Sequence, residues 1–546
     1  MQNKLVGHLH IAGELVKIFP DGVHAQVWAD YIRTKWNLPE VFYVDLRPFG
    51  PLTLYIADPV AASQYATTGQ SLPKGSYATS YIQKFLGVNN MVTLEGAHWK
   101  SLRTIFNPGF SLTNIMGLAD VIVDASLTFC DIIKRKAESG ELFELEALLT
   151  GLTIEVIGKV VLDTDTNAQT QRHPIAALFR ERSRLMPPSD AVFPWQAVDL
   201  LRPYKLWRNG TKLDREISKE LDLKIQRRAK ASKEEEESGK RAAKKRSVVD
   251  LAIDAYEKEI SATQNLDFKL LEPNDMPDSF RADITDSVKT FIFAGHDTTS
   301  STLCWATYLL HKHPEAYAKV QEELDTYFPP SLADTAIKIK EDPYIVNKLE
   351  YTTAVIKETM RIFPSASTTR APIPGGYVVD PATQQKIPMI DDNCHVWPVA
   401  YLVHRNKRFF PRPTEFIPER FIQSQTPFPD AELFTEAGKD AWRPFEKGPR
   451  NCIGQELAML EGKIILALTA REFDFVLEYP GEEADVQHPV PENTVEELSE
   501  KTEYGRAIRA GTKKPDRVEG HRVYQLLLGA AKPADGCPGR VYYRKK

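Results

Sequence analysis

The stretch RPFEKGPRNCIGQE at residues 443–456 holds a cysteine between two glycines and leads directly into an apolar segment, 457–468, with the pattern of a helix. A lone cysteine binds a large, soft cofactor only as the thiolate, so its surroundings must favour the anion. A helix that begins just after Cys452 directs free backbone N–H groups and the positive end of its dipole at the sulfur. Gly448 and Gly454 lack a Cβ atom, so the backbone can turn sharply and lie close to a flat ring. We therefore predict that Cys452 is a cofactor ligand.

Two further side chains of this stretch suit a flat, acidic cofactor. Arg450 supplies a fixed cation for a carboxylate on the ring, and Phe445 can pack on the cysteine side and keep water away. The alternative is a buried structural cysteine in a glycine-containing turn, which is the usual situation of a free cysteine. The order Phe-x-x-Gly-x-Arg-x-Cys-x-Gly resembles the haem-binding loop of cytochromes P450 at all five fixed positions. The resemblance implies haem b (iron protoporphyrin IX), with Cys452 as the axial ligand of the iron.

A second motif, Ala-Gly-His-Asp-Thr-Thr at residues 294–299, lies within a helical pattern that we expect to span 278–311. Gly295 weakens an otherwise bulky helix, and we expect it to open a groove where a diatomic ligand can lie against the backbone, with Ala294 lining the substrate side. Asp297 and Thr298 place an acid and an alcohol at this groove. Splitting O2 requires protons at its distal oxygen, which a hydroxyl that orders water and a carboxylate that reaches solvent can deliver. In the family, Thr298 takes the hydroxyl role and Asp297 the relay role; the alternative is a capping or kink feature of the helix.

The resemblance also assigns residues that would hold the haem propionates. Trp99 and Arg103 stand one helical turn apart, so they share a face, and in P450s a Trp-x-x-x-Arg pair on the third helix holds a propionate. Taken alone, this pair is more often an ordinary surface pair. Arg370 matches a region that lines the pocket and often donates to a propionate.

Three charged residues match a structural network of the family. Glu358 and Arg361 lie three apart in a predicted helix, 349–362, and can pair on one face. Arg420 follows in the sequence Pro-Glu-Arg-Phe, between that helix and the cysteine stretch. The resemblance implies that the three form a buried, charge-assisted network behind the haem that fixes the cysteine loop.

The resemblance implies a mainly α fold with small β-sheets, the triangular prism of the P450s, as a single domain over residues 1–546. We expect strands at 41–44, 52–56, within 372–403 around a turn at Asp380-Pro381, and at 473–475. We also expect a terminal hairpin between 524–527 and 540–543. The charge-dense segment 224–246 is predicted to be a solvated helix end followed by a flexible loop.

Composition restricts the other possibilities. The net charge of −5 predicts no nucleic-acid partner. The five cysteines are scattered singly, which argues against a zinc site or a disulfide framework. Charged and polar residues interrupt segment 1–20, so it has the pattern of neither a membrane anchor nor a secretory signal. The family implies the cytoplasmic face of the endoplasmic reticulum, and a soluble or peripherally attached protein is the alternative.

The expected activity is that of a haem-thiolate monooxygenase, which inserts one oxygen atom of O2 into a lipophilic organic substrate. The chain carries no fused flavin or iron–sulfur segment, so electrons must come from a separate partner. The resemblance implies an NADPH-cytochrome P450 reductase, with cytochrome b5 as a further donor. The C-terminal half resembles filamentous-fungal P450s, which suggests a secondary metabolite such as a polyketide or terpenoid. Two alternatives stay open: a P450-fold enzyme that rearranges or couples substrates without net hydroxylation, and a non-catalytic haem-binding sensor.

Overall fold

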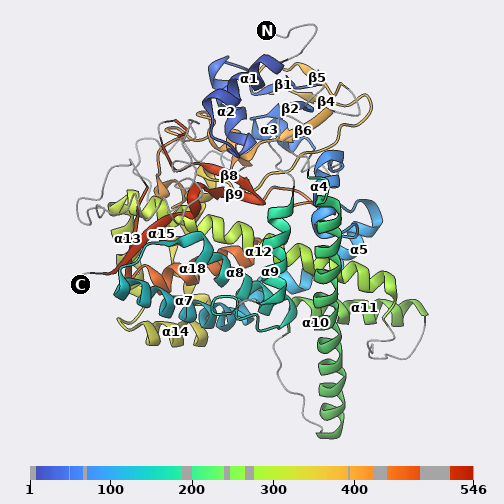
Figure 1. Ribbon diagram of the computed structural model, residues 1–546, viewed down its shortest axis with the longest axis vertical. Coiled ribbons are helices and arrows are strands. Elements are labelled where there is room, and N and C mark those ends of the chain that lie inside the picture. Colours follow the sequence, from blue (N-terminus) through green and yellow to red (C-terminus); the bar gives the residue numbers. More distant parts are fainter. Residues whose placement is uncertain are drawn as a thin grey trace.

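A computed structural model describes residues 8–47, 50–65, 71–171, 173–186, 199–238, 246–264, 276–390, 394–422, 440–479, 517–519 and 521–544. The chain is mainly helical with small sheets, as the sequence predicts. Figure 1 shows the sheet formed by β1, β2 and β6 at one end, with α1 and α2 beside it, and the larger helical body at the other end. The helices are α1 (Leu9–Ile18), α2 (Ala25–Lys35), α3 (Pro59–Ser63), α4 (Ser76–Leu86), α5 (Gly96–Phe106), α6 (Leu112–Gly117), α7 (Ala119–Ser139), α8 (Leu145–Leu162), α9 (Pro174–Leu185), α10 (Arg202–Ser238), α11 (Val248–Gln264), α12 (Asp278–Lys312), α13 (Pro314–Tyr327), α14 (Leu332–Glu341), α15 (Glu350–Ile362), α16 (Ala400–His404) and α18 (Gln455–Thr469).

The strands form sheets of two or three members. They are β1 (Val41–Asp45), β2 (Leu52–Ile56), β3 (Phe143–Glu144), β4 (Tyr377–Val379), β5 (Lys386–Pro388), β6 (Cys394–Pro398), β7 (Phe473–Leu477), β8 (Gln525–Leu528), β9 (Ala530–Pro533) and β10 (Pro538–Tyr543). Strand β2 pairs antiparallel with β1 and parallel with β6, which lies more than 300 residues later in the sequence. The hairpin of β4 and β5 turns at the predicted Asp380-Pro381.

The long helix α12 lies within the helical body because its neighbours cover it on most sides. Most of its central residues are buried, and it packs against α8, α15, α18 and β9. It ends at Lys312, two residues before Pro314, because the residue that precedes a proline disfavours the helical conformation. Most residues of helix α8 are buried, and its charged residues Glu146, Glu155 and Lys159 lie at partly exposed positions.

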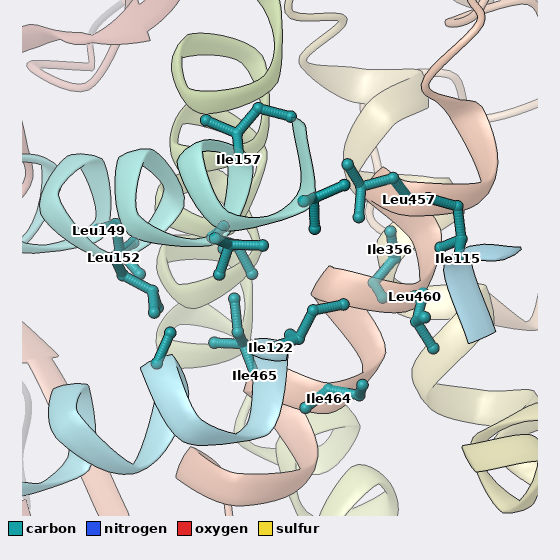
Figure 2. Close-up of a cluster of buried hydrophobic side chains, with 14 of the residues drawn as sticks. Ile115, Ile122, Leu149, Leu152, Ile157, Ile356, Leu457, Leu460, Ile464 and Ile465 are labelled. Carbon is teal, nitrogen blue, oxygen red and sulfur yellow. The ribbon is translucent and has the colours of Figure 1, made fainter. Parts of the chain in front are cut away.

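The main hydrophobic core joins helices from three separate parts of the sequence. Figure 2 shows side chains of α6, α7, α8, α15 and α18 meeting in one cluster. The cluster places α18, the helix that follows the cysteine stretch, in direct contact with the centre of the molecule. Its labelled members are Ile115, Ile122, Leu149, Leu152, Ile157, Ile356, Leu457, Leu460, Ile464 and Ile465.

The terminal hairpin predicted between 524–527 and 540–543 is wrong. Strand β8 pairs with β9 instead, and the turn between them passes through Gly529, which has a positive φ of 88° that glycine adopts readily. Strand β10 lies between β3 and β7, with Val541 opposite Phe475. The sequence pattern identified two of these strands but not their partners.

The charged segment 224–246 begins as a helix end, as predicted, but the first residues of this segment are not solvated. Helix α10 continues to Ser238, so residues 224–238 are helical, and Lys224 is only 7% exposed. Lys224 pairs with Asp250 at 2.9 Å, and Arg228 pairs with Asp254 at 2.8 Å, which joins α10 to α11. Basic side chains that look solvated in the sequence have acidic partners on the next helix. Residues 239–245 lie outside the described part of the chain.

A buried acid on α18 gives a testable stability effect. Glu461 is 2% exposed and its Oε1 atom has no hydrogen-bond partner. Desolvation raises the pKa of this carboxyl well above its usual value of 4.5. The folded chain therefore keeps Glu461 protonated where the unfolded chain releases the proton, so stability falls as pH rises above about 4.5, the ordinary glutamate value.

We expect Glu461→Met to raise the free energy of unfolding by about 1–3 kcal/mol at neutral pH, because the substitution removes an unpaired polar group from the core. The gain is expected to grow between pH 5 and 8, which urea unfolding at several pH values measures. Glu322→Gln, at an exposed site of α13, is the matched control and is expected to change little. A destabilised Glu461→Met protein would contradict this prediction.

Candidate active site

The cysteine stretch forms a tight loop just before α18. The N–H of Cys452 donates to the carbonyl of Phe445 at 2.9 Å, and the N–H of Asn451 donates to the carbonyl of Gly448 at 3.1 Å. Gly448 has a φ of 80°, so this position favours glycine as predicted. Gly454 has an ordinary φ of −88° and serves as the N-cap of α18. The sharp turn therefore rests on Gly448, and Gly454 is not required by backbone conformation.

The electrostatic surroundings of Cys452 differ from the sequence-based expectation. Its side chain is exposed, yet desolvation by the surrounding chain raises the pKa of its thiol. The N–H of Gly454 and the charge of Arg103 act in the opposite direction but do not outweigh it. The balance of these effects is a raised thiol pKa, whereas the sequence predicts surroundings that favour the thiolate.

Helix α12 presents the predicted groove residues on different sides. Ala294 is exposed although its helical neighbours Phe291 and Ile292 are buried, and Thr298 is half-buried one turn later. The hydroxyl of Thr298 donates to the carbonyl of Ala294 at 2.8 Å. Asp297 points elsewhere and is 4% exposed. The expectation that this carboxylate reaches solvent directly is therefore wrong.

The reason predicted for Gly295 is also corrected. A Cβ atom at this position would lie 2.7 Å from the side chain of Ile157, which belongs to α8. Real Cβ atoms do not approach this closely, so glycine here allows α12 and α8 to pack together. Its missing side chain makes room for a helix, not for a groove.

A group of cations converges beside the cysteine loop. The guanidinium of Arg450 lies 4.4 Å from the centre of the Trp99 ring, and its Nη1 atom is buried without a hydrogen-bond partner. Arg370 pairs through its backbone with Val396 and with Lys74. Desolvation lowers the pKa of Arg450 to about 10, and the nearby charge of Arg370 adds to this effect.

Lys74 is a member of this group that the sequence analysis missed. Desolvation lowers the pKa of its ammonium well below the usual value, and the charges of Arg370 and Arg450 lower it further. Its backbone N–H donates to the carboxylate of Glu95 at 2.9 Å, and its ammonium is 3.4 Å from the hydroxyl of Thr368. Lys74 stands in a polar loop segment with no motif of its own, so only its spatial neighbours reveal it.

Arg103 contacts a different part of the cysteine loop from Trp99. Its guanidinium donates to the backbone carbonyl and side chain of Asn451 at 2.9 and 3.0 Å, and to Asn107 at 2.9 Å. A cavity of ≈ 220 Å³ beside it is lined by Arg103, Asn451, Cys452 and Glu456, among others. Arg103 therefore holds the cysteine loop from the side of α5.

The three predicted network residues contact one another. Arg361 and Glu358 form a bidentate pair at 2.7 Å with both side chains fully buried, and Arg420 lies 3.3 Å from Glu358. Arg361 also donates to the carbonyls of His404, Pro413 and Glu415.

His404, which the sequence analysis missed, connects this network to the cysteine loop. Its Nδ1 donates to the carbonyl of Arg361 at 3.1 Å, and its Nε2 accepts from the N–H of Arg443 at 3.0 Å. Both bonds require the neutral ring, and desolvation, with the charge of Arg361, lowers the pKa of His404 to about 3. The first residue of the cysteine stretch is thus tied to the buried network.

The fold and these contacts define a class of protein that comparison with known families identifies. The family model described as Cytochrome P450 matches residues 47–495. The chain belongs to the cytochrome P450 family, and it is a monooxygenase of that family. Among the described residues, no helix has the length and apolar character to cross a bilayer.

The similar proteins include two fungal enzymes. The chain is 32% identical to cytochrome P450 monooxygenase polC of Polytolypa hystricis, over 98% of this chain and 88% of that protein. It is 33% identical to cytochrome P450 monooxygenase acrF of Aspergillus aculeatus, over 96% of this chain and 99% of that protein. Cytochrome P450 4V2 of Mus musculus is 28% identical over 78% of this chain and 75% of that protein.

Proposed function

We propose that this protein is a haem-thiolate monooxygenase that binds haem b through Cys452. The family implies a haem cofactor. The observation that carries the proposal is the exposed Cys452 thiol beside Arg450, Arg370 and Lys74, three cations whose pKa values desolvation lowers. The buried, unpaired Nη1 atom of Arg450 is a donor that a carboxylate of the cofactor would satisfy.

Several residues would hold the two propionates of this haem. The residues that bind them are Trp99 and the cations Arg450, Arg370 and Lys74. The cations suit this role because a buried cation is stable only beside an anion. Arg103 supports the cysteine loop from α5, and its charge opposes the desolvation that raises the pKa of the Cys452 thiol. Haem with a thiolate ligand supplies the oxygen-activating chemistry.

Residues of α12 manage water and protons at the reacting side. Thr298 orients a water molecule through its hydroxyl, and Asp297 holds the proton that this water passes on. Ala294 lies one turn before Thr298 on the exposed side of the helix and leaves room for a ligand. Phe445, which packs on Trp442 with ring centres 6.1 Å apart, keeps water from the cysteine side.

The substrate is a lipophilic organic molecule, and the likeness to fungal monooxygenases supports a secondary metabolite such as a polyketide or terpenoid. An NADPH-cytochrome P450 reductase supplies the electrons, with cytochrome b5 as a further donor. The protein acts at the cytoplasmic face of the endoplasmic reticulum. Strands far apart in the sequence share each three-stranded sheet, which supports one domain over the whole chain.

The test is a carbon monoxide difference spectrum of the dithionite-reduced protein, followed by turnover with the reductase under ¹⁸O2. A red-shifted thiolate-type Soret band and ¹⁸O in the product are expected. Products without ¹⁸O would replace hydroxylation with rearrangement or coupling. A histidine-type band, or no haem, would overturn the thiolate assignment, and haem binding without NADPH consumption would indicate a sensor.

Lys74→Met is expected to weaken haem retention. The ammonium of Lys74 belongs to the cation group proposed to bind the propionates, and removing one charge-assisted contact costs about 1–3 kcal/mol, or about 5- to 150-fold in haem dissociation. Transfer of haem to apomyoglobin measures this rate. Lys84→Met, at an exposed site of α4, is the matched control. Equal transfer rates in the two variants would contradict a propionate role for Lys74.

A further inference from the structure

The carboxylate of Asp297 is held by the C-terminal hairpin of β8 and β9. Its Oδ1 atom lies 2.7 Å from the ammonium of Lys532, and its Oδ2 atom accepts from the N–H of Ala530 at 2.6 Å. The side chain is 6% exposed. Asp297 in this position faces the hairpin, while Thr298 bonds to its own helix at the carbonyl of Ala294.

Lys532 has a second carboxylate partner. Its ammonium also donates to Glu146 in the first turn of α8, and Glu146 accepts from the hydroxyl of Thr150 at 2.8 Å. Desolvation alone would lower the pKa of Lys532, but Asp297 and Glu146 together raise it above the usual value. With 19% of its side chain exposed, Glu146 is more accessible to solvent than Lys532 or Asp297.

The other titratable groups near this cluster are neutral. His296 is fully buried, desolvation lowers the pKa of its ring, and it donates from Nδ1 to the carbonyl of Ile292. Desolvation raises the pKa of the Cys304 thiol well above its usual value. The cluster thus holds two carboxylates and one ammonium. Its net charge is negative, so one of the carboxylates can accept a proton.

The hairpin turn fits closely against Asp297 and the neighbouring aromatic ring. A Cβ atom at Gly529 would lie 2.4 Å from Oδ2 of Asp297 and 3.2 Å from the Phe293 ring. The hydroxyl of Ser301 and the indole of Trp305 both donate to the carbonyl of Ala531, one and two turns further along α12. The hairpin therefore runs along α12 with Asp297 at its tip.

We propose that Lys532 and Glu146 are positioning residues that control when Asp297 can pass a proton toward Thr298. Lys532 holds the carboxylate away from Thr298. Because Glu146 remains as a partner, Asp297 can leave without stranding a buried ammonium. A proton from solvent enters at Glu146, the outermost group. Lys532 gives one of its protons to Asp297 and takes the proton from Glu146, so the charge of Lys532 is unchanged and Glu146 is again a carboxylate. This inference rests on the proposed monooxygenase function.

Glu146→Gln is expected to slow proton delivery. Lys532 then has a single carboxylate partner, so Asp297 stays bound to it. The readout is hydrogen peroxide formed after the reduced, haem-loaded protein is mixed with oxygenated buffer, which needs neither substrate nor reductase. Each reduced haem gives one electron and, with a delivered proton, releases one hydroperoxyl radical, and two of these disproportionate to one hydrogen peroxide and one O2. We expect release about tenfold slower, with a larger solvent isotope effect in D2O.

Lys532→Met is expected to act in the opposite direction. Without the ammonium, two buried carboxyl groups face each other, and each takes up a proton at higher pH than before. Peroxide release should be faster at pH 8, and its pH midpoint should rise by about one unit or more. Lys532→Arg keeps the charge and should restore the wild-type profile.

A readout that does not depend on haem activity separates positioning from folding. Hydrogen exchange over residues 525–533 should rise in Lys532→Met, because Ala530 loses its fixed acceptor, and should stay low in Glu146→Gln. Lys224→Met removes another buried lysine, 2.9 Å from Asp250. This matched control should lower stability without altering peroxide release or exchange in the hairpin.

The outcomes distinguish this inference from the proposed function. If the wild-type protein lacks the thiolate-type Soret band, the proposed function fails, and the exchange pattern still reports on the ion cluster. If the band is present but Glu146→Gln and Lys532→Met change peroxide release in the same direction or not at all, the positioning roles are overturned. Opposite changes, with rescue by Lys532→Arg, support them.

Discussion

Replacing Cys452 with alanine is expected to abolish the thiolate-type Soret band and to reduce monooxygenation by at least about a thousandfold. Cys452 is the exposed cysteine of the chain, and the loop around it is fixed by backbone hydrogen bonds to Phe445 and Gly448. Alanine keeps this loop because those bonds use only main-chain atoms. The loss is therefore expected to be chemical, and urea unfolding of the apoprotein should change by less than about 1 kcal/mol, as for exposed positions generally.

Cys394→Ala is the matched control, because Cys394 is a buried cysteine of strand β6. It removes a thiol from the core and is expected to lower stability while leaving the thiolate-type band in place. The measurement is the carbon monoxide difference spectrum of both variants at equal protein concentration. A thiolate-type band that persists in Cys452→Ala, or disappears in Cys394→Ala, would contradict the assignment of Cys452.

Local pattern was enough to predict the helices that carry the motifs and several strands of this chain. The helix predicted over 278–311 spans Asp278–Lys312, and the strand predicted over 52–56 spans Leu52–Ile56. Such elements are visible because their periodicity lies within the segment itself. The partner of β10 was mispredicted because strand pairing is set by the whole fold: β10 inserts between β3 and β7, about 400 and 70 residues away, at sheet edges that no local pattern identifies.

The candidate site divides in the same way. Cys452, Arg450 and the Asp297-Thr298 pair stand in contiguous motifs and were predicted to be functional from the sequence. Lys74 and Lys532 have no motif, because each acquires its role from charged groups more than 200 residues away. Gly295 was predicted in the correct helix, but it was expected to border a ligand groove and instead lies against α8. The sequence shows that a glycine lacks a Cβ atom, but not which element packs into the space.

Arg361→Ala is expected to cause the largest loss of stability among the substitutions considered. Arg361 and Glu358 are both fully buried, and Glu358 also accepts from the N–H of Ile417 and from Arg420. Removing the guanidinium leaves Glu358 with a single cation and strips donors from the carbonyls of His404 and Pro413. Breaking a buried pair in this way costs about 3–5 kcal/mol.

The same substitution is expected to reduce haem content, because the network holds the cysteine loop through His404 and Arg443. Arg361→Lys should be nearly as damaging, since an ammonium cannot reproduce the bidentate contact with Glu358. Urea unfolding and the haem-to-protein absorbance ratio measure the two effects. Arg412→Ala, which removes an exposed arginine 3.3 Å from Glu415, is the matched control and should cost less than about 1 kcal/mol. If Arg361→Ala lowered stability but bound haem normally, the network would stabilise the fold without fixing the cysteine loop.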